Sequence, residues 1–244
     1  LAHIAEWHAS IQWQGLLSGR LVSDHIITRP LIHFTRPQAA QELQDAPAQK
    51  KSWQEALFAV YPLQINELSI KDGDVTYREN ATSNPVRLTN IQVLAENIRN
   101  VRSKPLQYPS RVQVEAMVAG GGRMKVDGHA DFFAEPSMGV DVDITLQDIN
   151  LADLLPLTAQ RQIHLTQGSL TTSGHVEFAP AAQEVRLASL NLHDVKADFV
   201  HAARTKQREQ RTAQQVSRTA AKAANHPTLL LRIDQGKVER SEFG

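Results

Sequence analysis

The sequence predicts a mainly β protein: an antiparallel sheet with a few short helices and one basic helix near the C-terminus. Apolar and polar residues alternate with a period of two along most of the chain, which is typical of strands with one buried and one wet face. Glycine and proline punctuate these runs as turn residues do. Only three segments have helical character, and they are described below in chain order.

The composition excludes several classes of protein. The chain has 244 residues, with 26 Lys and Arg, 26 Asp and Glu, and therefore no formal net charge. A dedicated nucleic-acid binder would normally be basic. The absence of Cys excludes a disulfide scaffold, Cys-ligated zinc and thiol catalysis. The hydrophobic fraction of 41% is too high for a disordered chain.

The N-terminal part predicts two strands, a linker and a helix. Ile4–Trp13 and Leu16–Phe34 alternate as strands, the second interrupted at Arg29-Pro30. Arg36–Lys51, rich in Gln, Ala and Pro, is expected to be a linker or loop. Ser52–Val60 begins with the spacing of a capping box, which predicts a short amphipathic helix.

The middle of the chain predicts a meander. Arg111–Val118 places Val or Ala at every second position, and Gly120-Gly121-Gly122 then provides a turn. Met124–Phe132 and Val140–Leu146 continue the alternation. Three successive antiparallel strands with a shared apolar face follow from this pattern.

The C-terminal part predicts a strand pair, a long strand and two helices. Ile163–Leu165 and Ser169–Phe178 are expected to pair across a turn at Gln167-Gly168. Val185–Phe199 is a long strand whose phase slip predicts a bulge at His193-Asp194. Asn150–Leu155 is a short helix at most.

The segment 201–226 is expected to be a basic polar helix. Its basic residues face a single acid, Glu209, and its only large aliphatic residue is Val216. A basic helix can lie on anionic lipid or nucleic acid, but this one lacks an apolar face and aromatic residues. We therefore favour a solvated helix that flanks or caps the sheet.

A short pattern recurs at Leu68–Tyr77, Ile163–Thr172 and Leu231–Arg240. Each copy has an alternating strand end, a glycine (Gly73, Gly168 and Gly236) and another alternating strand. We interpret each copy as a β-hairpin whose turn glycine has φ > 0, so that residues 227–244 begin a further hairpin repeat. Repeats of this kind build elongated sheets, although any meander produces such patterns by chance.

The residues that could carry chemistry are few. Asp141 and Asp143 share one strand face, where a solvated surface is the more common role for such a pair than acid–base work. The histidines His3, His8, His25 and His33 have no metal-ligand spacing. We expect no enzyme, no cofactor and no metal.

The apolar face of the sheet is the main candidate site. Little helix is available to cover it, so either the sheet folds over on itself as a closed sandwich or it leaves an apolar groove suited to acyl chains. The residues expected to line such a groove are Val112, Val114, Val118, Met124, Val126, Phe132, Val140, Val142, Ile144, Leu146, Leu170, Val176 and Phe178.

The stretch Leu63–Arg78 resembles the pattern P-x-x-I-x-x-L-x-I-x-x-G-x-V-x-Y-x-D of the bacterial AsmA-like proteins, and most closely the branch known as DUF748. Segments that also fit this family are Leu88–Ile91, Arg99–Ser110, Val126–Phe132, Asp148–Pro156 and Gly168–Phe178. The chain departs from the pattern at Arg78-Glu79-Asn80, where an Asp is expected, and the basic helix fits no part of it.

The resemblance implies a periplasmic protein of Gram-negative bacteria, anchored in the inner membrane by a segment outside this chain. It also implies an elongated, curled β-groove, formed here by residues 1–200, that passes phospholipid between the inner and outer membranes. The chain does not begin with Met, and we interpret it as a piece of a longer protein. The expected partners are phospholipid or another acyl lipid, both membranes through other parts of the protein, and envelope proteins, but no nucleic acid.

Two other functions remain open. The chain could be a scaffold or chaperone-like module for outer-membrane protein or envelope assembly that acts through its sheet edges. It could also be a hydrolase or carbohydrate-active domain, which would need a polar pocket with convergent carboxylates.

Overall fold

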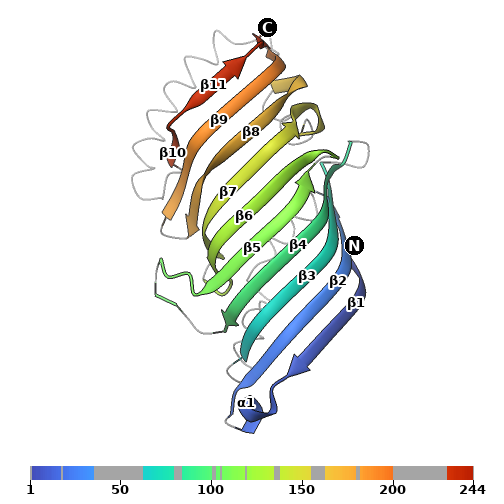
Figure 1. Cartoon of the computed structure of the whole chain (residues 1–244), viewed down its shortest axis with the longest axis vertical. Helices are drawn as coiled ribbons and strands as arrows, with labels where there is room; N and C mark the ends of the chain where they lie inside the picture. The colour runs from blue at the N-terminus through green and yellow to red at the C-terminus, as the bar shows by residue number, and fades with distance from the viewer. Residues whose placement is uncertain are drawn as a thin grey trace, which may run out of the picture.

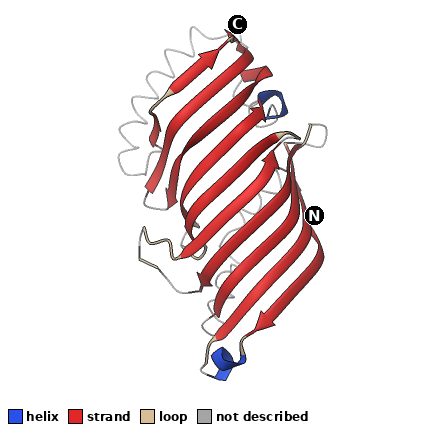
Figure 2. Cartoon of the chain, viewed as in Figure 1, coloured by secondary structure: helices blue, strands red, loops and turns tan. Residues whose placement is uncertain are grey.

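A computed structural model of the chain describes residues 2–17, 19–35, 63–79, 84–100, 103–104, 106–118, 120–134, 138–154, 163–179, 182–199 and 230–243. The expected linker at 36–51, the helix at 52–60 and the basic helix at 201–226 lie outside these residues. Strands make up nearly all of the described chain (Figure 2).

The described strands form one twelve-stranded sheet. A short helix, α1 (Trp13–Leu17), joins the first two strands, and a 3₁₀ helix, η1 (Leu151–Leu154), follows the seventh. The strands are β1 (Ala2–Ile11), β2 (Leu21–Thr35), β3 (Leu63–Arg78), β4 (Val86–Arg99), β5 (Ser110–Val118), β6 (Gly122–Asp131), β7 (Gly139–Asn150), β8 (Ile163–Ala179), β9 (Ala182–Phe199), β10 (Leu230–Ile233), β11 (Gly236–Glu239) and β12 (Glu242–Phe243).

The strands lie side by side in chain order from β1 to β10, and the sheet does not close on itself (Figure 1). This confirms the mainly β fold and decides between the two alternatives in favour of an open sheet. The sheet is mixed rather than purely antiparallel, because β2 pairs with β3 in parallel and β9 pairs in parallel with β10, β11 and β12. Every other neighbouring pair is antiparallel.

The predicted central meander is confirmed. β5, β6 and β7 pair antiparallel in regular register, and the turn between β5 and β6 contains Gly120 with φ of +78°. The short helix expected after residue 150 is η1. The predicted bulge in β9 is also present, because Asp194 has φ of +51° and the register with β8 shifts beside it.

The hairpin interpretation of the recurring pattern is wrong. Leu68–Tyr77 lies inside the single strand β3, and residues 163–172 lie inside the single strand β8. The third copy spans β10 and β11, which follow one another along β9. Gly73, Gly168 and Gly236 are therefore not the turn residues of hairpins, and β10 and β11 do not form one, because both pair in parallel with β9.

The physical reason for this error is the left-handed residue within each long strand. Asp72 has φ of +55° and precedes Gly73. One such residue produces a bulge that shifts the side-chain alternation while the strand continues, whereas a hairpin turn would reverse the chain. The same holds for Arg29, with φ of +51°, so β2 continues through the expected interruption at Arg29-Pro30.

The N-terminal strand ends earlier than expected. β1 stops at Ile11, and Trp13 begins α1. Farther along the sheet, a compact cluster forms where β4 ends beside the turn after β6. It contains the buried residues Ala95, Ile98 and Phe133, with Ile65, Leu68, Val112 and Phe132 packed against them.

Candidate functional site

One face of the sheet is apolar from its first strand to its last. Directly paired residues on neighbouring strands point to the same face, so the registers can be followed across the sheet. One line of paired positions, the central row, contains only apolar residues and one glycine: Trp7, Ile27, Ile70, Val93, Val114, Val126, Ile144, Gly174, Leu187 and Ile233.

Two further rows lie on the same face, one next to the central row and one two rows away from it on the other side. The row nearer α1 has a single polar member, His25, and otherwise contains Ala9, Leu68, Ala95, Val112, Gly128, Val142, Val176, Val185 and Leu231. The row on the far side contains Ile32, Val75, Leu88, Val118, Gly122, Ile149, Leu170, Leu192 and Val238. The apolar face is therefore several rows deep and crosses the whole sheet.

The bulges keep this face continuous along each strand. In β7, Leu146 and Ile149 are three positions apart, yet they pair with Thr172 and Leu170, which are two positions apart on β8. The extra residue is accommodated at Asp148, with φ of +54°. Asp and Asn tolerate this conformation better than most residues, which explains why Asp72, Asn90 and Asp194 occupy similar positions.

The structure brings the predicted lining residues together. Twelve of them lie in β5, β6, β7 and β8 and share the apolar face: Val112, Val114, Val118, Met124, Val126, Val140, Val142, Ile144, Leu146, Leu170, Val176 and Phe178. The other, Phe132, follows β6 and packs against the cluster around Ala95. Val142 is 5% exposed, whereas Phe178 is 40% exposed, so the face is buried in part only.

Sequence reasoning missed half of this face. The residues of β1 to β4 and of β9 and β10 continue the same rows, including Trp7, Ile70, Val93 and Leu187. The alternation in Leu63–Ile70 and in β9 was a usable signal. The alternation does not show how neighbouring strands align, because Asp72 and Asn90 each shift the apolar–polar alternation by one residue within their strands.

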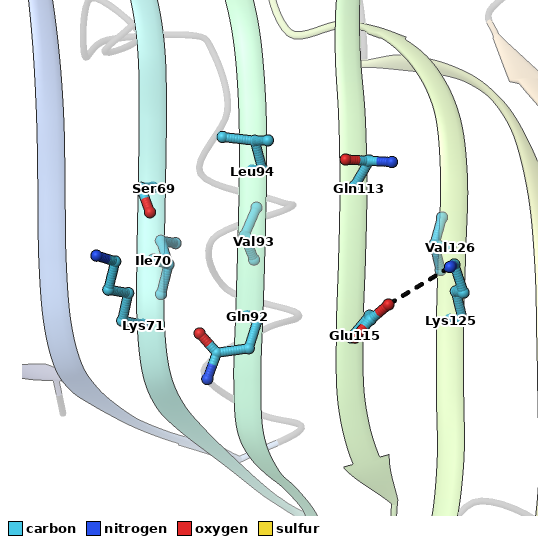
Figure 3. A pocket seen from close by; sticks show the side chains of 10 residues that line it. All are labelled: Ser69, Ile70, Lys71, Gln92, Val93, Leu94, Gln113, Glu115, Lys125 and Val126. Carbon is cyan, nitrogen blue, oxygen red and sulfur yellow. Dashed lines mark ion pairs between the residues drawn. The ribbon is translucent and has the colours of Figure 1, made fainter.

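The opposite face is polar and carries shallow hollows. One hollow of about 320 Å³ lies over β3 to β6 and is lined by Ser69, Lys71, Gln92, Leu94, Gln113, Glu115 and Lys125 (Figure 3). Its lining also includes Ile70, Val93 and Val126, which belong to the central row. Lys125 Nζ lies 3.5 Å from Glu115 Oε1 across it, and Gln92 donates a hydrogen bond of 2.7 Å to Asp72. Pairs of this kind are typical of a solvated surface.

His175 lies between the two carboxylates noted in the sequence. Its Nε2 is 2.9 Å from Asp141 Oδ1 and its Nδ1 is 3.0 Å from Asp143 Oδ1. Pairing of β7 with β8 brings the imidazole there, a contact that alternation alone does not predict. Among the residues that the structure describes, no group of three or more His, Asp or Glu side chains has the arrangement of a metal site.

Tyr108 links the loop before β5 to β8. Its hydroxyl donates a hydrogen bond of 2.9 Å to Glu177 Oε1. Partial burial, this hydrogen bond and the negative charges of Glu177 and Asp141 together raise the pKa of Tyr108 above its ordinary value. The phenol therefore stays protonated and keeps the loop joined to the sheet.

None of the described helices has the length and hydropathy of a membrane span. Comparisons with protein families, curated proteins and solved structures give no match for this chain.

Proposed function

We propose that the apolar face binds the acyl chains of phospholipid and lets them pass along the sheet. The observation that supports this most directly is the central row, which crosses the sheet without a charged or polar member from Trp7 to Ile233. From the resemblance to AsmA-like proteins we infer that the activity takes place in the periplasm, in a protein that is anchored to the inner membrane and supplies lipid to the outer membrane.

The mechanism is passive, and no bond is made or broken. Each buried CH₂ group stabilises a bound chain by about 0.8 kcal/mol, so a chain lying along the rows is held firmly. Successive members of a row are chemically alike. An acyl chain that moves along a row from one strand to the next therefore exchanges one aliphatic contact for another. Headgroups would remain at the wet rim of the sheet.

A charge placed on the apolar face tests the proposal. Ile144 lies in the central row and is half-buried, whereas its neighbour Thr145 is half-buried on the polar face. We expect Ile144→Lys to lose the phospholipid that co-purifies with the chain, measured by mass spectrometry, and Thr145→Lys to retain it. Ile144 suits this test better than Val142, because Val142 is so deeply buried that a charge there would unfold the sheet.

Circular dichroism of both variants controls for folding. The proposal fails if folded Ile144→Lys carries as much lipid as the unmodified chain, or if no lipid accompanies any of the three proteins. Equal loss in both variants would also contradict it, since the two faces would then be indistinguishable.

A second function, a scaffold for envelope assembly, is favoured by a different observation. Every residue of the edge strand β1 is exposed, and an edge strand offers unpaired backbone groups to a strand from another chain. A proline at Ala5 would remove one backbone donor. If strand addition is the function, Ala5→Pro should weaken capture of a β-rich partner and leave the co-purified lipid unchanged.

A further inference from the structure

The most unusual exposed surface of the molecule lies at one corner of the sheet, around α1. Trp13 is 73% exposed and Leu17 is 90% exposed. These residues and Leu16 are spaced i, i+3 and i+4, so they lie on one side of the helix. Large apolar side chains gathered in this way normally mark a contact surface.

The corner is held in place by its backbone. Gln12 N–H donates to Val22 O at 2.9 Å, and Arg20 N–H donates to Gly15 O at 2.9 Å. Gly15 lies directly against β2, since a Cβ added there would be 2.9 Å from Val22 Cγ2. Figure 1 shows α1 at the corner of the sheet, beyond the ends of β1 and β2. The side of the helix that carries Gly15 is fixed to the sheet, and Trp13 and Leu17 on the other side are exposed.

Other exposed apolar residues lie at the same ends of the strands, which we call the α1 rim. There β1, β4, β6 and β8 end, and β2, β3, β5, β7 and β9 begin. Leu106 precedes β5, Met138 precedes β7 and Phe178 lies near the end of β8, and all three are exposed. Toward the opposite rim, Ile4 and Ile32 are 48% and 41% exposed, which is less than Trp13 and Leu17.

We propose that the α1 rim docks on the surface of a lipid bilayer, with Trp13 and Leu17 inserted among the headgroups. Tryptophan prefers the membrane interface because its ring is apolar and its indole N–H is polar. From Ile11 to Val22 the only charged residue is Arg20, which suits an anionic headgroup.

Docking of the α1 rim on a bilayer does not depend on the binding of acyl chains to the apolar face. It requires only that the corner meets a bilayer, and it gives the sheet a defined end at which lipid could enter or leave. The test must therefore separate contact with a membrane from uptake of a single lipid.

The absence of Cys in the chain allows a clean labelling experiment. Leu17→Cys and Gln147→Cys, each in the full chain, are labelled with an environment-sensitive fluorophore and mixed with phosphatidylcholine vesicles containing phosphatidylglycerol. Gln147 is exposed on the polar face, far from the rim. We expect the emission at position 17 to shift to the blue and the emission at position 147 to stay unchanged.

Flotation with the same vesicles provides an independent measurement. The double variant Trp13→Ser, Leu17→Ser should bind vesicles at least about tenfold more weakly, because it removes most of the inserted apolar surface. Leu31→Ser, which alters an exposed apolar residue on the polar face of the sheet, should bind normally. Uptake of a monomeric fatty acid, measured without vesicles, should be the same in all of them.

Three results would overturn the docking of the rim. The first is equal emission changes at positions 17 and 147. The second is normal flotation of the double variant. The third is a blue shift at position 17 that grows with protein concentration in the absence of vesicles, which would identify the corner as a protein contact instead.

Discussion

Gly168 offers a sharp test of the fold, because the structure gives it a role quite different from that of a turn residue. It lies inside β8, opposite the bulge of β9, with φ of +123°. A Cβ at this position would lie 2.8 Å from the Cα of Val195 and 2.9 Å from its Cγ2. Val195 is 2% exposed, so it has no room to move away.

Gly168→Ala therefore combines two costs. A non-glycine residue in this backbone region is strained by about 1–3 kcal/mol, and forcing an extra methyl against a packed side chain costs about 1–3 kcal/mol more. The free energy of unfolding should fall by roughly 2–6 kcal/mol, the sum of these ranges. For a chain of this size the thermal midpoint should fall by roughly 5–20 °C.

Gly236→Ala is the matched control. Gly236 occupies the same place in the recurring sequence pattern, but a Cβ there meets nothing within 4 Å, and its φ is not in the left-handed region. Thermal melts followed by circular dichroism should leave its midpoint unchanged. Equal losses in the two variants, or no loss in either, would refute the packing of Gly168 against Val195.

Two further predictions concern the core and the response to pH. Ile149 is 1% exposed, so Ile149→Ala should lower the free energy of unfolding, measured by urea titration, by about 2–5 kcal/mol. The control is Ile233→Ala, because Ile233 is exposed. A smaller loss for Ile149→Ala than for Ile233→Ala would contradict the burial of Ile149. Because the pKa of Tyr108 is raised by folding, the unfolded chain loses this proton at lower pH than the folded chain does, and stability should fall as the pH rises above about 10. Tyr108→Phe should reduce that fall in urea titrations between about pH 8 and 11, and identical slopes would refute the contribution of Tyr108.

The alternation of apolar and polar residues in the sequence is sufficient to predict where strands occur. It is not sufficient to predict how long the strands are or which of them pair. The regular strands β5, β6 and β7 follow directly from the alternation of residues such as Val112 and Val114 with polar neighbours. The longer strands β3 and β8 were divided in two, because Asp72 and Gly168 resemble the turn residues of a hairpin. A left-handed residue looks the same in sequence whether the chain then reverses or continues, and only the pairing across the sheet distinguishes the two.

Prediction of the apolar face from the sequence is limited in the same way. Val126 and Ile144 could be assigned to one face from their own strands, but their alignment with Trp7 and Ile70 depends on registers set across several strands. The contact between His175 and its two aspartates is also a product of register. The exposed corner at α1 was hidden for another reason, since Trp13 continues the alternation of β1 and so was expected to lie in the strand.

Parallel pairing occurs at two places in the sheet, between β2 and β3 and between β9 and β10 to β12, and this has a consequence for how such a fold could be extended. After the parallel step from β2 to β3, six antiparallel steps lead to β9, which therefore has the same polarity as β2, and another parallel step follows. The strands after the two parallel steps, β3 and β10–β11, also carry the first and third copies of the recurring pattern. A unit of seven strands, β3 to β9, thus lies between the two parallel steps, and the first and third copies of the recurring pattern directly follow those steps, whereas the second copy lies inside the unit, in β8. Such a unit could be joined to another in tandem without reversing any strand or interrupting the apolar rows.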